Sequence, residues 1–192
     1  MTRLEFLLEE PSMESFLKGF LPKILPEGYV YNGNYFLRPH QGKSDLLKSI
    51  PRKIKTNYGE DTIVIILHDQ DSNNCVTLKQ KIDTICQNNC ASNNQYLIRI
   101  VCRELESWYL GDLNAVKQAF PKFNATTYQN KAKFRNPDLL NAANELTRLL
   151  PEFQKNKGAK LISQHIDIKN NKSISFQQFV TGLQKILQSI NT

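Results

Sequence analysis

Acidic side chains follow three apolar segments of the sequence, each of which has the composition of a β-strand. The carboxylates that come after these segments are Glu10 and Glu14, Asp69 and Asp71, and Glu104 and Glu106. Because carboxylates held close together repel one another, such a group makes physical sense mainly when a cation lies among them. Oxygen ligands with few His and no Cys favour Mg²⁺, Mn²⁺ or Ca²⁺ over zinc. The pattern therefore predicts a site for a hard divalent cation.

Each acidic pair also has a simpler interpretation. A lone Asp-x-Asp after a strand often forms a surface turn or a helix cap, and Glu104 and Glu106 would fit the solvated start of a helix. Glu9 is interpreted as an exposed strand residue. The metal prediction depends on the combination, because three separate strand ends carry the same chemistry.

The elements that must position these residues follow from hydrophobic periodicity. Residues 62–67 form a continuous β-branched apolar run, which is typical of a strand buried on both faces of a parallel sheet. The other predicted strands cover residues 4–9, 29–38 and 96–102, and the predicted helices between them cover residues 12–24, 44–58 and 75–90. This order predicts an α/β fold with a doubly wound, mostly parallel four-stranded sheet. The carboxyl ends of its strands would gather the acidic residues at one edge.

The part of the chain after Gly111 is predicted to be helical, with no strong strand. We therefore expect an α/β domain over residues 1–115 and a basic helical C-terminal portion over residues 116–192, packed on the first. Ser175 and Gln178 fit a capping box that opens the last helix. The spacing of Trp108 favours core packing over stacking on a nucleic-acid base.

Charge is divided unevenly between these two parts. The 192 residues carry a net charge of +7, yet residues 1–116 hold 13 basic and 14 acidic side chains, whereas residues 117–192 hold 12 basic and 4 acidic ones. A basic portion suits a polyanion, with nucleic acid as the first candidate, and a solvated surface is an equally good explanation of the charge. The side chains predicted to hold phosphates are Lys43, Lys131, Lys133, Arg135, Lys157 and Lys160.

Cysteine usage and hydropathy exclude several other classes of protein. The four cysteines form no C-x-x-C pair, so an ordinary zinc site is not expected, and reduced thiols in a cytoplasmic protein are the expectation. No apolar run approaches the roughly 20 residues that a membrane span needs. The N-terminus has no signal-peptide pattern, so no membrane is expected among the partners.

The ordered acidic motifs resemble those of the Toprim (topoisomerase–primase) domain, which has a Glu after its first strand and an Asp-x-Asp after a later one. The matching segments are EEPSME at 9–14 and DQD at 69–71. The segment ELESWY at 104–109 is similar to the extra acidic segment of Toprim-like proteins related to the overcoming-lysogenization-defect (OLD) nucleases. With GKSDL at 42–46, the chain most resembles small stand-alone Toprim-like proteins of bacterial anti-phage and abortive-infection systems, over at least residues 5–140.

This resemblance implies a role for each acidic residue. The implied ligands of Mg²⁺ or Mn²⁺ are Glu10, Asp69, Asp71, Glu106, Glu104 and Glu14. Glu10, Asp69 and Asp71 would be catalytic, with Glu10 as a metal ligand or a general acid/base. Pro11 departs from the family pattern, which has Gly there, and its missing N–H puts a backbone contact to phosphate in doubt.

The resemblance also implies an activity: metal-dependent hydrolysis of phosphodiester bonds in DNA or RNA, as an effector of a bacterial phage-defence system acting with an AAA-type ATPase partner. Metal ions held by carboxylates can stabilise both the attacking and the leaving oxygen. Two alternatives stay open. One is a non-catalytic Toprim-like subunit of an ATPase complex. The other is an enzyme whose Asp-x-Asp binds a metal–nucleotide, as in many glycosyltransferases, although 192 residues leave no room for a long acceptor domain.

Overall fold

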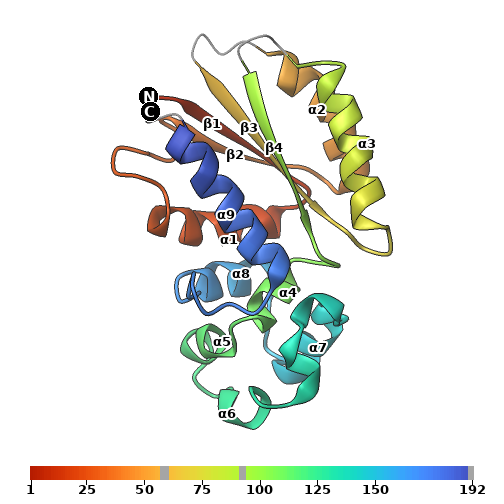
Figure 1. Ribbon diagram of the computed structural model, residues 1–192. Helices are drawn as coiled ribbons and strands as arrows, with labels where there is room; N and C mark the ends of the chain where they lie inside the picture. The colour runs from red at the N-terminus through yellow and green to blue at the C-terminus, as the bar shows by residue number, and fades with distance from the viewer. Residues whose placement is uncertain (57–60, 91–93, 190–192) are drawn as a thin grey trace.

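Four parallel strands form the centre of the molecule in the computed structural model, which describes residues 1–56, 61–90 and 94–189. The strands are β1 (Arg3–Leu8), β2 (Tyr35–Pro39), β3 (Thr62–Asp69) and β4 (Asn94–Val101), in the spatial order β2-β1-β3-β4 (Figure 1). Every pair is parallel, so all four strands end at the same edge. The predicted parallel α/β sheet is therefore confirmed.

Helices cover both faces of this sheet. On one face, α2 (Lys43–Lys55) and α3 (Cys75–Gln87) pack on Leu7, Val64 and Ile66. On the other face, α1 (Pro11–Phe20) and α9 (Ile174–Ser189) pack on Phe6 and Ile65. Successive residues of β3 thus enter different hydrophobic clusters, and all eight residues of the strand are buried. This double burial explains why residues 63–67 are apolar without alternation.

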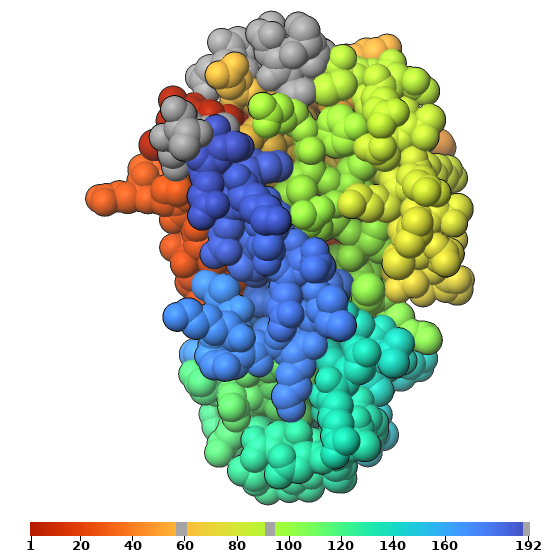
Figure 2. Space-filling model, viewed as in Figure 1, coloured from red at the N-terminus to blue at the C-terminus, as the bar shows by residue number. Residues whose placement is uncertain are grey.

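The chain beyond β4 is helical where the structure describes it. Its short elements are α4 (Glu106–Leu110), α5 (Leu113–Ala119), α6 (Ala125–Tyr128), the 3₁₀ helices η2 (Ala132–Arg135) and η3 (Pro137–Leu139), α7 (Ala142–Leu149) and α8 (Lys155–Ser163). They lie beyond the carboxyl edge of the sheet, and α9 then returns along β4 (Figures 1 and 2). One hydrophobic cluster contains side chains from both the sheet and these helices, with Trp108 fully buried in it and stacked on Phe179.

Helices α1 and α8 form a parallel pair that is important for the site. Near their C-terminal ends Gly19 lies against Ser163, so closely that a Cβ at Gly19 would collide with the Ser163 Oγ. Lys23, in the 3₁₀ helix η1 (Leu21–Lys23), donates hydrogen bonds to the carbonyls of Ser163, Gln164 and Ile166. These bonds satisfy acceptors that the end of α8 leaves free. The opposite, N-terminal ends of both helices consequently lie together at the carboxyl edge of the sheet.

Several predicted boundaries are corrected by the structure. The second strand begins at Tyr35, because residues 30–34 form a turn held by hydrogen bonds to the Val30 carbonyl. The last helix is capped by Ser173, whose Oγ accepts from the Phe176 amide at 3.1 Å, and the proposed capping box at Ser175 is wrong. Ser175 Oγ instead accepts from the Trp108 indole at 2.9 Å. Among the described residues, no helix is both long and apolar enough to cross a membrane.

Candidate active site at the carboxyl edge of the sheet

Three acidic side chains from separate elements converge where the strands end. Asp69 is the last residue of β3, Glu10 stands between β1 and α1, and Glu106 opens α4. The negative charges of Glu10 and Glu106 both act on Asp69 and raise its pKa, so the three carboxyl groups lie within electrostatic range of one another. We call these three residues the inner carboxylates.

Asp69 is the most confined of the inner carboxylates. Its side chain is only 6% exposed, and its Oδ1 is buried without a hydrogen-bond partner. Burial, followed by the charges of Glu9, Glu10 and Glu106, holds the pKa of Asp69 well above its usual value. A buried acceptor that lacks a partner, among groups of the same charge, is short of positive charge.

Glu106 has a similar environment. It is only 2% exposed, and burial raises its pKa to about 7, with smaller contributions from the charges of Glu104 and Glu10. Lys155 acts in the opposite direction and lowers the pKa of Glu106. The carboxyl group therefore changes its charge near neutral pH, which is unusual for Glu and typical of functional sites.

Among the described residues, Lys155 is the one basic side chain that forms an ion pair with an inner carboxylate. Its Nζ lies 2.6 Å from Glu10 Oε2, while the Ser12 hydroxyl donates to Glu10 Oε1 at 2.5 Å. Burial lowers the pKa of Lys155, but the hydrogen bond to Glu10 and the charges of Glu106, Glu10 and Asp69 outweigh it, so the pKa is raised. The ammonium group stays charged and partly neutralises the inner carboxylates.

Glu9 contacts His68 and the backbone of Asp69 at the end of β3. Glu9 Oε2 accepts a hydrogen bond from the Asp69 amide at 2.9 Å. The same oxygen lies 2.9 Å from His68 Nδ1. Burial lowers the pKa of His68, but its hydrogen bond to Glu9 and the charge of Glu9 raise it overall. Glu9 is buried, so the expectation of an exposed strand residue is wrong. The side chain ties the end of β1 to the end of β3.

The other predicted acidic ligands lie outside the inner carboxylates, and we call Asp71, Glu104 and Glu14 the outer carboxylates. Asp71 is exposed and lies 3.3 Å from Lys43 Nζ. Glu104 Oε1 accepts from the Ala143 amide at 2.7 Å, at the start of α7. Glu14 Oε1 pairs with Lys18 at 2.7 Å and accepts from the Tyr31 hydroxyl at 3.1 Å.

The inner carboxylates fit a hard cation by their chemistry. In residues 1–56, 61–90 and 94–189, no three His, Cys, Asp or Glu side chains are already arranged to hold a metal ion. The donor set is nevertheless made of carboxylate oxygens, and Asp69 Oδ1 is free to bind. Burial, and after it the neighbouring carboxylates, raises the pKa values of Asp69 and Glu106, and a divalent cation would favour their ionised forms.

The predicted phosphate-binding residues are exposed and differ in their contacts. Lys43 lies beside Asp71, at the first turn of α2. Lys133 Nζ lies 2.5 Å from Glu145, and Lys131 lies over the Tyr128 ring at 4.6 Å. The remaining three residues are exposed and form no ion pair with any described residue; they are Arg135, Lys157 and Lys160. Two of these follow Lys155 on α8.

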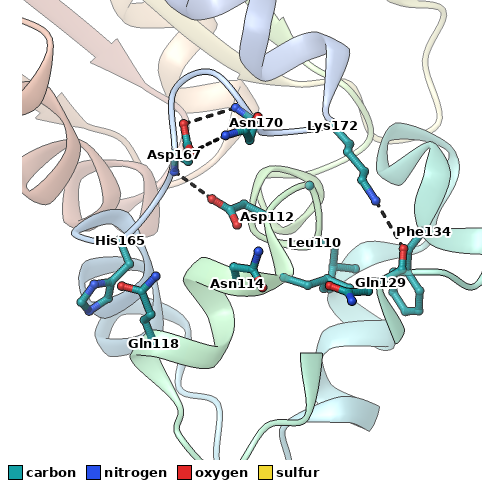
Figure 3. Close-up of a pocket in the computed structure, with 12 residues that line it drawn as sticks. Leu110, Asp112, Asn114, Gln118, Gln129, Phe134, His165, Asp167, Asn170 and Lys172 are labelled. Carbon is teal, nitrogen blue, oxygen red and sulfur yellow. Dashed lines mark hydrogen bonds between the residues drawn. The ribbon is translucent and has the colours of Figure 1, made fainter. Parts of the chain in front are cut away.

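A separate cavity of about 460 Å³ lies between α5 and the segment that joins α8 to α9 (Figure 3). Its two acids serve the backbone: Asp112 accepts from the amides of Ala115 and Asp167 at 3.0 and 2.8 Å. Asp167 accepts from the Lys169 amide at 2.8 Å and from the Asn170 side chain. These carboxylates therefore hold the backbone of the loop in place.

Sequence reasoning missed Lys155 and the role of Glu9. Lys155 lies 145 residues from Glu10 along the chain, and only the pairing of α1 with α8 brings the two together. Nothing in the local sequence of Lys155 distinguishes it from its neighbours. Glu9 carried a usable signal, because it is the first of two consecutive glutamates at a strand end.

Comparison with known proteins gives one family and one structural likeness. Residues 8–184 match the family described as Domain of unknown function (DUF4276). The curated proteins contain no significant match to this sequence. A solved structure, the C-terminal region of the Xanthomonas campestris pv. campestris OLD protein, is similar over 99% of this chain and 96% of that one, with 8% identity and a TM-score of 0.46.

Proposed function

We propose that this chain, which belongs to the DUF4276 family, is a divalent-cation-dependent nuclease that hydrolyses phosphodiester bonds of DNA or RNA. The observation that carries the proposal is the buried, unpartnered Oδ1 of Asp69 beside Glu10 and Glu106. The order of the motifs, which resembles that of Toprim domains, supports the same reaction.

The cation would be held by the inner carboxylates. Bound Mg²⁺ or Mn²⁺ would supply charge stabilisation at the phosphate and a water of lowered pKa. The protein contributes the fixed geometry, because Glu9 anchors the Asp69 backbone and Ser12 orients Glu10. The resemblance also implies Asp71, Glu104 and Glu14 as ligands, and each of these side chains would have to leave its present partners to bind a cation.

Lys155 has two roles in this proposal. Without a cation, its ammonium group offsets the charge of the inner carboxylates through Glu10. With a cation bound, that neutralisation is no longer needed, and the half-exposed side chain is free to hold a phosphate oxygen of the substrate. An ammonium at this place would favour the negative charge that grows on phosphate during hydrolysis.

The exposed basic residues would hold the flanking phosphates of the strand. Lys157 and Lys160 share α8 with Lys155, and Lys43 lies beside Asp71 at the same end of the sheet. Arg135, Lys131 and Lys133 extend the positive charge to η2 and its neighbourhood. Such contacts position a nucleic acid without reading its sequence, so binding should weaken steeply with salt.

A cleavage assay tests the proposal. Purified protein is incubated with plasmid DNA, single-stranded DNA or RNA, and Mg²⁺ or Mn²⁺. Glu10→Gln and Asp69→Asn should each abolish cleavage, because each removes a charged ligand. Glu27→Gln, which changes an exposed glutamate on a distant turn, is the matched control and should cleave like the wild type. Cleavage that survives both inner changes would contradict the proposal.

The second candidate is a non-catalytic subunit that binds an ATPase. The observation in its favour is that no three described acidic, His or Cys side chains are already arranged around a metal position, while Lys155 pairs with Glu10. Calorimetry distinguishes the two candidates. A chain that binds neither Mn²⁺ nor Mg²⁺ and leaves every nucleic acid intact would favour the subunit. The phage-defence role and the ATPase partner are proposals that depend on the Toprim resemblance.

A further inference from the structure

Tyr109 carries a hydroxyl group that no described contact explains. The side chain is completely buried, and its OH has no hydrogen-bond partner. Buried polar groups in proteins are almost always paired, because losing water without gaining a partner costs free energy. A buried hydroxyl without a partner therefore needs an explanation, and use in another state of the protein would supply one.

The position of Tyr109 links it to the inner carboxylates. It lies in α4, three residues after Glu106, and residues spaced in this way share one face of a helix. Its ring packs against Phe16 of α1 and Phe153, with centroids 5.7 and 6.2 Å apart. Phe16 lies in α1, whose N-cap is Glu10, and Phe153 comes just before Gln154, the N-cap of α8. The ring is thus locked between the two segments that bring Glu10 and Lys155 together.

The charges around the hydroxyl agree with this placement. Burial, followed by the charges of Glu106, Glu10 and Asp69, holds the pKa of Tyr109 well above its ordinary value. The phenol consequently stays protonated and can only serve the site as a neutral hydrogen-bond donor or acceptor. The three inner carboxylates lie within electrostatic range of the phenol, and one of their oxygens, Asp69 Oδ1, also lacks a partner.

We propose that Tyr109 is a positioning residue of the cation-loaded site. Its hydroxyl donates a hydrogen bond to an oxygen that becomes fixed when the cation binds, either a carboxylate oxygen of Glu106 or Asp69 or a water on the ion. This inference depends on the proposed cation site. Groups that orient metal ligands in this way commonly change metal affinity by 10- to 100-fold when they are removed.

The test uses Tyr109→Phe, which keeps the aromatic packing and removes only the hydroxyl. In the metal-free protein the melting temperature should rise by about 2–4 °C, because an unpartnered polar group leaves the core. Affinity for Mn²⁺, measured by calorimetry with MnCl₂ alone, should fall by about 10- to 100-fold. The upward shift in melting temperature that Mn²⁺ causes should shrink correspondingly.

Tyr96→Phe is the matched control. The Tyr96 hydroxyl donates to Asp83 Oδ1 at 2.8 Å, away from the inner carboxylates. Its removal should lower the melting temperature and leave Mn²⁺ affinity unchanged, which is the opposite pattern.

Tyr109→Phe with a lower metal-free melting temperature and wild-type Mn²⁺ affinity would overturn the inference, because the hydroxyl would then be purely structural. A wild-type chain that binds no Mn²⁺ would overturn it as well. If Mn²⁺ binds and depends on Tyr109 but no nucleic acid is cleaved, the inference stands and the proposed nuclease activity fails.

Discussion

The inner and outer carboxylates come from the same sequence motifs but lie in opposite environments. Asp69 is buried with a free oxygen, whereas Asp71, two residues later, is exposed beside Lys43. Glu106 is buried with a pKa of about 7, whereas Glu104 accepts a hydrogen bond from the backbone of α7. In each of these two pairs one member is buried close to the other carboxylates, and the other is less buried and bonded elsewhere. Burial among like charges therefore distinguishes Asp69 and Glu106 from their neighbours better than the motif itself.

The largest expected effect separates Asp69 from Asp71. Asp69→Asn should reduce Mn²⁺ affinity and cleavage by more than about 100-fold. It removes a buried charged ligand, and this loss should be larger than the loss caused by removing a group that only orients a ligand. Asp71→Asn should reduce them by less than about tenfold. Calorimetry and the cleavage assay measure both. Equal losses in the two variants would show that Asp71 moves into the site and would remove the distinction between inner and outer carboxylates.

Protonation of Glu106 should give the next largest effect. Because a cation requires the ionised carboxylate, Mn²⁺ affinity should rise about tenfold between pH 6 and pH 8, around the pKa of about 7. The metal-free protein should behave in the opposite sense. In the folded protein the pKa of Glu106 is about 7, above the ordinary value of 4.5. Between these two pH values the folded state therefore binds more protons than the unfolded state, and the stability of the fold falls as the pH rises from about 4.5 to about 7.

Calorimetry and thermal melting across this pH range measure both trends. Glu106→Gln should flatten the stability profile, with a remaining slope from Asp69, whose pKa is also raised. An unchanged profile in Glu106→Gln would show that the carboxyl group has an ordinary pKa and would remove it from the inner carboxylates.

The smallest effect concerns Glu104 and is structural. Glu104→Ala removes the acceptor for the Ala143 amide and should lower the free energy of unfolding by about 1 kcal/mol, the usual cost of losing a helix cap. Urea denaturation measures this change, and Mn²⁺ affinity should stay within about twofold of the wild type. A large loss of affinity with little loss of stability would place Glu104 in the cation site.

The sheet could be predicted because local sequence determines it. The apolar run of β3 is buried on both faces, and the alternation of strands with helices leaves few other topologies. That order also placed Glu10, Asp69 and Glu106 at one edge. Burial, in contrast, depends on what packs over the edge, and helices distant in the sequence decide it.

Lys155 and Tyr109 show why the rest of the site could not be predicted. Lys155 reaches Glu10 because Gly19 lets α8 approach α1, a contact with no local signature in the sequence. Tyr109 follows Trp108 in an apolar segment and resembles an ordinary core residue. Its significance comes from a hydroxyl without a partner, which only the packed structure reveals.

The most direct test of the central claim is a crystal structure of the full chain soaked with Mn²⁺, with the ion located by its anomalous scattering. We expect an anomalous peak within bonding distance of Glu10, Asp69 and Glu106, with the Lys155 Nζ withdrawn from Glu10. An absent peak at these residues, with Lys155 still paired to Glu10 at millimolar Mn²⁺, would contradict the account.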